Sequence, residues 1–477
     1  MKNKGNRVLV SGVWYTISSI AIRGVAIITT PIYTSMLSTS DYGTANTFNS
    51  WIEIFNIFTC LCVVYSIGRA KIDFKDKFDE YLSSLQGLSS TFAAVVLLLA
   101  FMFREQLSAW MKYEVPLIIV LFVYLVISPS VEYALQKYRY EYRYKENILI
   151  SLIICIGTVA MSIILMLVFK DQRYIGKIIG SIITTFLLGL WFYIRILKSG
   201  KTFYKKEYWE YALKIGLPMI PHALALVVLA QVDRIMIRDI CGEAEAGLYT
   251  FGYGFATLLS IFTNAIGQAW LPWFNEQLNE EKRENIRKNQ KKLVILGCFL
   301  TIGFVCIAPE ALIILSPNAK AYWVAKWVIP PVALGTLAQY FYTNYVNVEL
   351  FYKKTPIIAV SSIAAAVVNY VLNYLAIPRF GYISAAYTTL ISYLFLLLFH
   401  YITTRFVMKQ KVYANSYMFV MMAISFVIGM ILCSLYDVIL LRYVVSVLIL
   451  ITFAIMRRHD IMYGIGIIKN KVKHMKQ

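Results

Sequence analysis

The sequence predicts an all-α integral membrane protein with about fourteen transmembrane helices, and three observations lead to this prediction. Of its 477 residues, 59% are hydrophobic and only 15% are charged, whereas a soluble globular chain carries about 25% charged residues. Apolar segments long enough to cross a bilayer recur along the whole chain. The loops between them are short. A soluble enzyme, a disordered chain and a fibrous repeat are therefore excluded.

The expected spans follow from the apolar segments, because about 20 helical residues cross the hydrocarbon core. The first is read as a retained span rather than a signal peptide, since it is too long and no small-residue cleavage site closes it. The last two are separated only by a tight turn at Asp437. The fourteen spans are 8–37, 42–67, 82–103, 115–135, 147–169, 174–194, 212–238, 246–271, 293–316, 323–349, 356–377, 382–402, 416–435 and 439–456.

The charges between the spans predict the orientation. With the N-terminus inside, 34 Lys and Arg residues fall in the expected inner segments and ten in the expected outer loops. This ratio is a strong positive-inside signal, so both termini are expected in the cytoplasm. The inner segments are 1–7, 68–80, 136–146, 195–214, 276–292, 353–354, 405–411 and 457–477. The longest hydrophilic stretches, 195–211 and 275–292, each have room for one amphipathic helix and for no catalytic domain.

The net charge of +20 would suggest nucleic acid in a soluble protein. Here the positive charges lie between apolar runs, so we interpret them as the cytoplasmic excess and expect no nucleic-acid partner. The seven cysteines are scattered, nearly all within apolar runs, and the four histidines are far apart in sequence. No zinc, haem or redox spacing is present, so no metal and no cofactor are predicted.

An internal repeat predicts two lobes. The turn Asp41-Tyr42-Gly43 and the turn Glu245-Ala246-Gly247 share an acid, one residue and a glycine at an offset of 204 residues. Six helices lie within that offset, so the two units run in the same direction, about an axis along the membrane normal. Coincidence between two such turns is the alternative. The expected division is an N-lobe at 1–200, a C-lobe at 201–411, and 412–477 with the last helix pair and a basic tail.

Polar residues recur at helical spacing within several spans and indicate which faces avoid lipid. Arg23 lies about 22 Å along the first helix from Val8, at 1.5 Å per residue, beyond easy reach of the cytoplasmic surface. The tenth span carries a stripe of Gln339, Tyr340, Thr343, Asn344 and Asn347 that ends at Glu349. The residues that we predict to line a central substrate cavity are Arg23, Asn49, Glu53, Asn56, Asp233, Arg234, Asn264 and Gln268.

Each of these residues has a second interpretation. Arg23 and Glu53 suit a cationic cavity that holds an anion, but they also suit an ion pair across the first hairpin. Asp233 similarly suits either a cavity wall or a pair with a neighbouring arginine. Glu53, Asp233 and Glu349 are further candidates to carry protons or to bind sodium. Asn, Gln and Ser side chains in membrane helices often join neighbouring helices by hydrogen bonds.

Several local patterns resemble the oligosaccharide flippases of the multidrug/oligosaccharidyl-lipid/polysaccharide exporter superfamily. The patches run from the expected first helix to the twelfth, and their order and spacing carry the resemblance more than any single patch. They are Leu37-Ser38-Thr39-Ser40-Asp41-Tyr42-Gly43, Leu217-Pro218, Asp233-Arg234, Gly247-Leu248-Tyr249, Ile307-Ala308-Pro309-Glu310 with Tyr322 and Ala325, and Pro378-Arg379-Phe380-Gly381-Tyr382-Ile383-Ser384-Ala385-Ala386.

The resemblance implies a multi-pass protein of the bacterial cell membrane in which helices 1–6 face helices 7–12. It implies movement of an undecaprenyl-pyrophosphate-linked oligosaccharide to the outer leaflet, for O-antigen, capsule or exopolysaccharide synthesis. Such a flippase is no enzyme. Its partners would be the lipid-linked oligosaccharide, membrane lipids, a coupling proton or sodium ion, and polysaccharide polymerase machinery around a monomer. By analogy with the lipid II flippases, the helices in 416–456 are candidates for a lipid-tail groove.

Two other functions remain in view. A multidrug or organic-cation exporter of the same superfamily would need acidic or aromatic cavity walls, and Arg23 argues against it. A membrane-embedded glycan polymerase or glycosyltransferase would need a sizeable outer loop or acidic motifs at the membrane surface. The expected outer loops have about four to twelve residues and almost no acids. No phosphate-binding Gly-x-x-x-x-Gly-Lys-Ser/Thr loop is present, so transport without nucleotide is expected.

Overall fold

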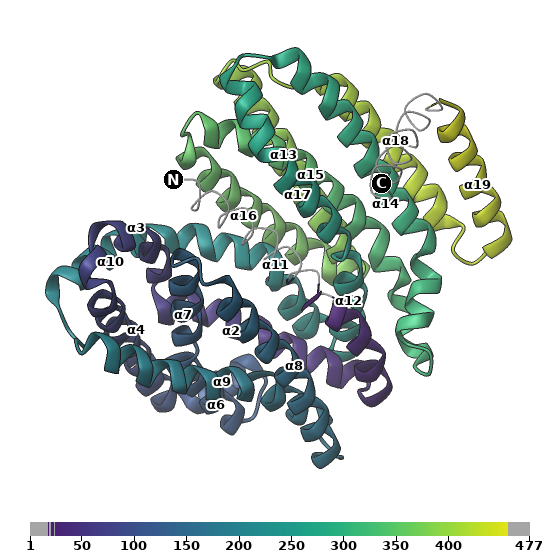
Figure 1. Ribbon diagram of the computed structural model, residues 1–477. Coiled ribbons are helices and arrows are strands. Elements are labelled where there is room, and N and C mark those ends of the chain that lie inside the picture. Colours follow the sequence, from purple (N-terminus) through teal and green to yellow (C-terminus); the bar gives the residue numbers. More distant parts are fainter. Residues whose placement is uncertain (1–17, 19–20, 23, 457–477) are drawn as a thin grey trace, which may run out of the picture.

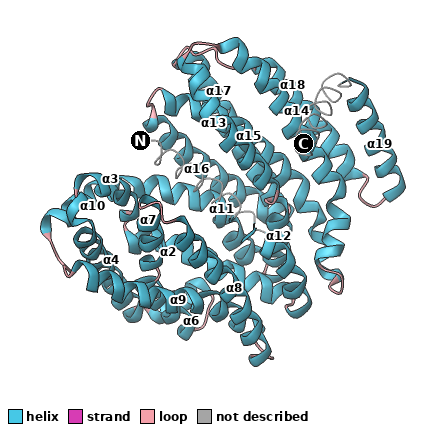
Figure 2. Ribbon diagram, viewed as in Figure 1, coloured by secondary structure: helices cyan, strands magenta, loops and turns pink. Residues whose placement is uncertain are grey.

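The computed structural model describes residues 18, 21, 22 and 24–456, and within this part of the chain helices are joined by short turns (Figures 1 and 2). Residues 24–36 are helical. The named α-helices of the first half are α2 (Thr39–Cys60), α3 (Ile67–Asp73), α4 (Phe78–Met102), α5 (Arg104–Met111), α6 (Val115–Ile127), α7 (Pro129–Tyr140), α8 (Tyr144–Val168), α9 (Arg173–Gly200) and α10 (Lys206–Gly216). Those of the second half are α11 (Ile220–Ile240), α12 (Glu243–Ala256), α13 (Leu259–Asn279), α14 (Arg283–Leu315), α15 (Ile329–Phe351), α16 (Thr355–Phe380), α17 (Ser384–Ile402), α18 (Asn415–Ser434) and α19 (Ile439–Met456).

The all-helical membrane fold is confirmed, but the count of fourteen spans is not. In the described residues, nine helices are long and apolar enough to cross a membrane, and a tenth follows if α2 and the segment Val63–Asp73, bent by 57°, form one span. Of the expected first span, 8–37, residues 18, 21, 22 and 24–37 are described, and 24–36 are helical. The other residues of this span and the tail 457–477 lie outside the described part of the chain. Each of the other thirteen expected spans coincides with a helix or with two consecutive helices.

Breaks within these helices have local causes. Span 115–135 divides at Ser128, because Pro129 begins α7 and cannot donate a backbone hydrogen bond. Span 212–238 lies within one continuous apolar segment, Lys206–Ile240, that is long enough to cross a membrane. Within this segment α10 ends at Gly216, and Pro218 lies in the 3₁₀ turn before α11. The hydrophilic stretch 275–292 forms no separate helix, since α13 and α14 extend into it and leave only a short turn between them.

The segment that follows the expected division at residue 200 keeps contacts with the first half of the chain. Helix α10, which begins the expected C-lobe, packs on the N-lobe. Tyr208 and Ala212 are buried with Tyr81 and Leu85 of α4. Trp209 Nε1 donates a hydrogen bond to the Ser84 carbonyl oxygen at 2.9 Å. The chain therefore passes to the C-lobe in α11, whose first residues still pack against Ile57 of α2.

The two lobes meet where the start of α2 lies beside α12 (Figure 1). A Cβ atom at Gly43 would lie 1.9 Å from the Glu243 carbonyl oxygen, and one at Gly247 would lie 1.9 Å from the Thr39 carbonyl oxygen. Only glycine permits this approach at both positions. The contact is reciprocal between the two glycines of the expected repeat, which is the arrangement that a two-fold axis between the lobes produces.

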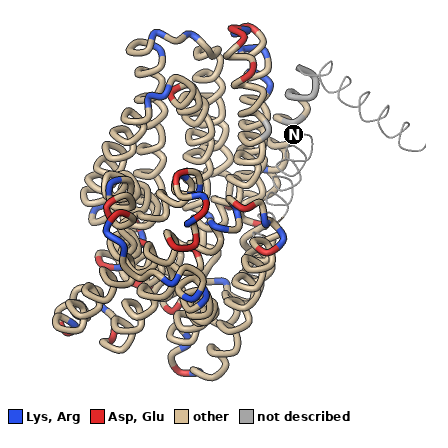
Figure 3. Tube along the Cα trace, turned by 60° about the vertical axis from the view of Figure 1, so that its left-hand side comes forward, with Lys and Arg blue, Asp and Glu red and all other residues tan. Residues whose placement is uncertain are grey.

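The charged turns gather at two ends of the helices. Segments 68–80, 136–146 and 195–211 contact one another through the ion pairs Lys71–Glu141 and Lys137–Asp79 and the hydrogen bond from Tyr211 to Asp73. In the C-lobe, segments 276–292 and 405–411 contact each other through hydrogen bonds from Arg283 to Gln410 and from Arg287 to the Lys411 carbonyl oxygen. We name this side of each lobe the basic end, and the side with the α2–α12 contact the closed end. Figure 3 shows long stretches of helix without charge between the charged turns.

Candidate functional site

A chain of polar side chains joins the lobes between α2 and α11. Gln231 Nε2 of α11 donates to Glu53 Oε2 of α2 at 2.6 Å, and Ser50 Oγ donates to Gln231 Oε1 at 3.1 Å. Arg234 donates to the same Gln231 oxygen and, at 2.8 Å, to the Ala230 carbonyl oxygen. Its guanidinium also lies over the Tyr253 ring, 5.0 Å from the centroid. Glu53 and Arg234 are therefore linked through one amide, and Glu53 stays exposed.

Next to this link is a pocket of about 250 Å³. It is lined by α2, the turn that follows α2, α7 and α11. We call it the acidic pocket, because Glu53 and Glu132 line it and no Lys or Arg is among its described lining residues. Asn56 also lines it and accepts a hydrogen bond from Cys60 Sγ at 3.0 Å. Glu132 is not among the residues predicted from the sequence, because it lies just after the break at Pro129, near the end of an apolar span.

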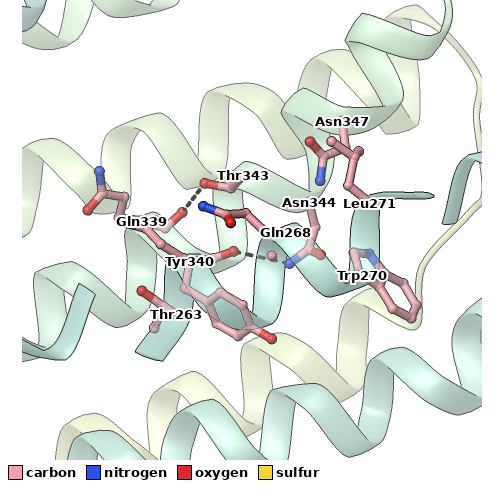
Figure 4. A pocket seen from close by; sticks show the side chains of 11 residues that line it. Thr263, Gln268, Trp270, Leu271, Gln339, Tyr340, Thr343, Asn344 and Asn347 are labelled. Carbon is pink, nitrogen blue, oxygen red and sulfur yellow. Dashed lines mark hydrogen bonds between the residues drawn. The ribbon is translucent and has the colours of Figure 1, made fainter. Parts of the chain in front are cut away.

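A second pocket, of about 280 Å³, lies within the C-lobe between α13 and α15. Figure 4 shows side chains of the two helices facing each other across it. We call it the amide pocket. Its lining includes five side-chain amides and two large aromatic rings, and no charged residue: Thr263, Asn264, Gly267, Gln268, Trp270, Leu271, Gln339, Tyr340, Thr343, Asn344 and Asn347.

Local hydrogen bonds position two of these side chains. Thr343 Oγ1 donates to the Gln339 carbonyl oxygen at 2.8 Å, and Asn344 Nδ2 donates to the Tyr340 carbonyl oxygen at 3.1 Å (Figure 4). Such bonds to the previous helical turn fix side-chain orientation without a partner from another helix. Amides offer both donors and acceptors, and flat aromatic rings offer apolar faces. The amide pocket thus has the chemistry that sugar hydroxyls and sugar ring faces require.

Asp233 lies away from both pockets, in the interior of the C-lobe, where it is 1% exposed. Its carboxylate accepts hydrogen bonds from Tyr249 Oη at 2.6 Å, Thr389 Oγ1 at 2.8 Å and Asn373 Nδ2 at 2.5 Å. Asn373 also donates to Asn369 Oδ1 at 3.2 Å. These neutral groups, rather than an arginine, supply the hydrogen bonds of Asp233, and the network that they form joins four helices.

A second buried titratable group lies nearer the basic end. His400 Nδ1 is 2.9 Å from Glu349 Oε2, and His400 Nε2 is 3.1 Å from Ser361 Oγ. All three residues are buried. Glu349, at the end of the polar stripe of α15, is therefore buried against His400 and is not among the described lining residues of the amide pocket. In residues 18, 21, 22 and 24–456, no group of three or more His, Cys, Asp or Glu is placed to hold a metal ion.

The predicted site residues divide among these places. Asn264 and Gln268 line the amide pocket, Glu53 and Asn56 line the acidic pocket, and Arg234 lies in the link between the lobes. Asn49 is partly exposed on α2 and lines neither pocket, and Asp233 is in the C-lobe interior. Arg23 lies outside the described residues. The stripe on α15 was recognised in the sequence, but its place opposite Asn264 and Gln268 required the fold.

Comparison with curated proteins identifies the family. The sequence model described as "Polysaccharide biosynthesis protein" matches residues 8–278, more than half of the chain. A Haemophilus influenzae protein named "Lsg locus putative protein 1" is 26% identical over 220 residues, which is 43% of this chain and 52% of that protein. The chain therefore aligns with about half the length of this relative.

Comparison with solved structures shows the same architecture. A structure of the lipid II flippase MurJ in an inward closed conformation matches with a TM-score of 0.69 and 15% identity, covering 94% of this chain and all of that one. An inward-facing multidrug resistance transporter of the MATE family, in the MOP superfamily, matches with a TM-score of 0.59 and 12% identity, covering 83% of this chain and 98% of that one. The chain has this fold and belongs to the polysaccharide biosynthesis protein family.

Proposed function

We propose that the protein is a flippase that carries an undecaprenyl-pyrophosphate-linked oligosaccharide from the cytoplasmic to the outer leaflet. The product would serve the synthesis of O-antigen, capsule or exopolysaccharide. The observation that carries the proposal is an uncharged, amide-lined pocket with Trp270 and Tyr340, in a chain of the polysaccharide biosynthesis family. An uncharged lining suits the neutral part of the substrate. A lipid-linked pyrophosphate and its sugars cannot cross hydrocarbon unaided, because desolvation of the ion alone costs roughly tens of kcal/mol.

The anionic part of the substrate needs a different environment. Arg234 is the described cation at the link between the lobes, and Arg23 is predicted on the helix before α2. We propose that these arginines favour the pyrophosphate, since guanidinium groups bind phosphate oxygens in pairs. Glu53, held by Gln231 and linked to Arg234 through it, would leave the network when the lobes move. In this proposal the cationic part of the cavity lies between the lobes at Arg23 and Arg234, outside the amide pocket and the acidic pocket, whose described linings contain no Lys or Arg.

The proposed orientation places both termini in the cytoplasm and the basic end at the inner surface of a bacterial cell membrane. It is supported by the 34 Lys and Arg residues in the inner segments and by the contacts that group those segments within each lobe. In a background without native cysteines, Lys170→Cys and Lys320→Cys should react with an impermeant reagent in intact cells. Lys288→Cys should not react. Labelling at Lys288 from outside would reverse the orientation.

We also propose that Asp233 is the site at which a coupling ion acts. A carboxylate this deep in a membrane protein is costly unless it is neutralised or paired. Here its hydrogen bonds come from one amide and two hydroxyl groups. Binding of a proton or a sodium ion would remove the buried charge and would alter the contacts between α11, α16 and α17. A gradient of that ion would then bias the conformation of the C-lobe.

One observation favours a second function. Glu53 and Glu132 line the same pocket without a cation among its described residues, which is the wall that an exporter of organic cations would need. The protein would then act as a multidrug exporter of the same fold. Arg234, one residue along from Asp233 and hydrogen-bonded to the partner of Glu53, argues against this function. A glycan polymerase has less support, since the described outer turns are short.

Deletion of the gene tests these functions against one another. A flippase predicts that synthesis of the lipid-linked oligosaccharide continues, that it accumulates on the cytoplasmic leaflet, and that mature surface polysaccharide disappears. An exporter predicts unchanged polysaccharide and new sensitivity to cationic dyes. An enzyme predicts precursors that differ covalently from those of the wild type. Normal polysaccharide in a strain without a second flippase would reject the proposal.

A further inference from the structure

A third pocket lies at the basic end of the C-lobe, outside the site described above. Its volume is about 560 Å³, twice that of the amide pocket. Four cations line it, from α14, the turn after α17 and the loop before α18: Arg287, Lys291, Arg405 and Lys411. The rest of its lining is Tyr401, Tyr413, Ala414, Asn415, Ser416 and Tyr417, so no carboxylate is among the described lining residues. We call it the basic pocket.

The four cations lack the partners that basic residues have elsewhere. At the basic end of the N-lobe, Lys71, Lys137 and Lys205 lie 3.3, 2.5 and 3.1 Å from carboxylate oxygens. In the described part of the chain, no carboxylate oxygen lies within 4.0 Å of a basic nitrogen of Arg287, Lys291, Arg405 or Lys411. The four positive charges therefore repel one another, and no protein carboxylate pairs with any of them within that distance.

The walls of the basic pocket are held in place before any ligand arrives. Arg287 Nη2 donates to the Lys411 carbonyl oxygen at 2.5 Å, which ties α14 to the loop. The buried Gln290 accepts from the Ala414 backbone nitrogen at 2.9 Å. Tyr413 donates to the Asn344 carbonyl oxygen at 3.0 Å, and the Lys291 ammonium lies 5.5 Å from the Tyr417 ring centroid. A preorganised site loses less conformational entropy when it binds.

Helix α18 adds to the positive field. It begins at Asn415, and no side chain caps its N-terminus. Its first-turn amide groups and the positive end of its dipole therefore favour an anion on this side. Serine and asparagine in that turn are among the lining residues. The ligand that these groups suit is a phosphate, since arginine, lysine, amide hydrogens and hydroxyls all donate to its oxygens.

Exposed apolar side chains, which we call the apolar surface, lie at the end of α17, in the turn after it and on α18, the segments that flank the lining residues 405 and 411–417. Ile402 and Phe406 are 44% and 61% exposed, and Val420 and Ile424 are 56% and 44% exposed. These side chains would face lipid hydrocarbon in the proposed orientation. We propose that the basic pocket binds the phosphate of an anionic membrane lipid, whose chains lie along this apolar surface. The proposal does not depend on the flippase assignment, because it needs only a membrane with phosphate-bearing lipids on the basic side.

Native mass spectrometry of the full-length protein in detergent tests this site. The probes are phosphatidylglycerol, undecaprenyl phosphate and, as the zwitterionic reference, phosphatidylcholine with the same acyl chains as the phosphatidylglycerol. We expect phosphatidylglycerol or undecaprenyl phosphate to bind about tenfold more tightly than phosphatidylcholine, a difference of 1.4 kcal/mol. The preferred probe identifies whether a phospholipid or a prenyl carrier supplies the phosphate. Equal binding of all three would overturn the proposal.

The matched variants are Lys291→Gln with Arg405→Gln, and Lys353→Gln with Lys354→Gln. Each pair removes two positive charges from the same end of the C-lobe, but Lys353 and Lys354 do not line the pocket. We expect the first pair to lose the preference for anionic lipid and the second to keep it, with both eluting as the wild type on size exclusion. Equal losses would indicate a diffuse surface charge and reject the pocket. Displacement of lipid by inorganic phosphate at equal concentration would reject the role of the lipid chains.

Discussion

The interiors of the two lobes differ in charge. The buried polar side chains in the described part of the N-lobe are all Ser, Thr, Asn or Gln, such as Ser66 and Gln86. Tyr and Cys aside, the described chain from residue 201 onward buries five ionisable residues: Asp233, Arg238, Glu349, His400 and Arg442. Buried charge is costly in lipid and is seldom kept without a purpose. We infer that the C-lobe, rather than the N-lobe, is the part of the protein that responds to ions.

The five buried ionisable residues have different surroundings, so they do not all serve this role. Arg238 donates to the Met111 and Lys112 carbonyl oxygens at 3.0 and 2.8 Å and so joins the lobes at the closed end. Arg442 of α19 forms an ion pair with Glu310 of α14. Only Asp233 and the Glu349–His400 pair lie between α11, α15, α16 and α17, where a change of charge would alter helix packing within the C-lobe.

The largest expected effect is that of Asp233→Asn. We expect transport to fall by about two orders of magnitude, the upper range for loss of a group beside a bound ion. The protein should still fold, because asparagine can accept from Tyr249 and Thr389. The measurement is uptake of lipid-linked substrate by liposomes under a proton or sodium gradient. Ser66→Ala, a buried polar change in the N-lobe, is the control, and equal losses in both variants would remove the distinction between the lobes.

A smaller effect is expected on stability when Glu349 is removed. Glu349→Ala leaves His400 without its buried partner, and we expect a loss of about 3 kcal/mol, as for other broken buried pairs. Gln86→Ala in the N-lobe removes a hydrogen bond to Ser90 and should cost about 1 kcal/mol. Thermal unfolding in detergent compares the two. If Gln86→Ala proves as destabilising as Glu349→Ala, the Glu349–His400 pair contributes no more to stability than a single buried hydrogen bond in the N-lobe.

The smallest expected effect concerns the contact between the lobes. In Gly247→Ala, the new Cβ would overlap the Thr39 carbonyl oxygen, and we expect a cost of about 1–3 kcal/mol to the closed end. Gly254→Ala, on the same helix, meets no heavy atom within 4 Å and serves as the control. Disulfide formation between Ser40→Cys and Glu243→Cys reports the contact, since these side chains are 2.9 Å apart in the wild type. Unchanged cross-linking in Gly247→Ala would show that this approach does not hold the lobes together.

The helical membrane fold could be predicted because each span is visible as one long apolar run in consecutive residues, and the charges of the loops beside it indicate its orientation. The same reasoning identified Gly43 and Gly247, since a repeated turn is visible without knowledge of contacts. Helix breaks were less predictable, because Pro129 and the turn after α10 interrupt runs that remain apolar throughout. Two of the three hydrogen-bond partners of Asp233, Asn373 and Thr389, lie 140 and 156 residues away, and no local pattern connects them to it. For the same reason, the hydrogen bond from Gln231 to Glu53 could not be predicted, since the two residues are 178 positions apart.

The central claim is that the protein moves a lipid-linked oligosaccharide between leaflets. The most direct measurement reconstitutes the purified protein in liposomes that carry a labelled undecaprenyl-pyrophosphate-linked oligosaccharide, and follows access of the label to an impermeant reagent. We predict transfer to the opposite leaflet without nucleotide, dependence on a proton or sodium gradient, and its loss in Asp233→Asn. Liposomes that leave the label in its original leaflet, while the same protein preparation transports a cationic dye, would contradict the account.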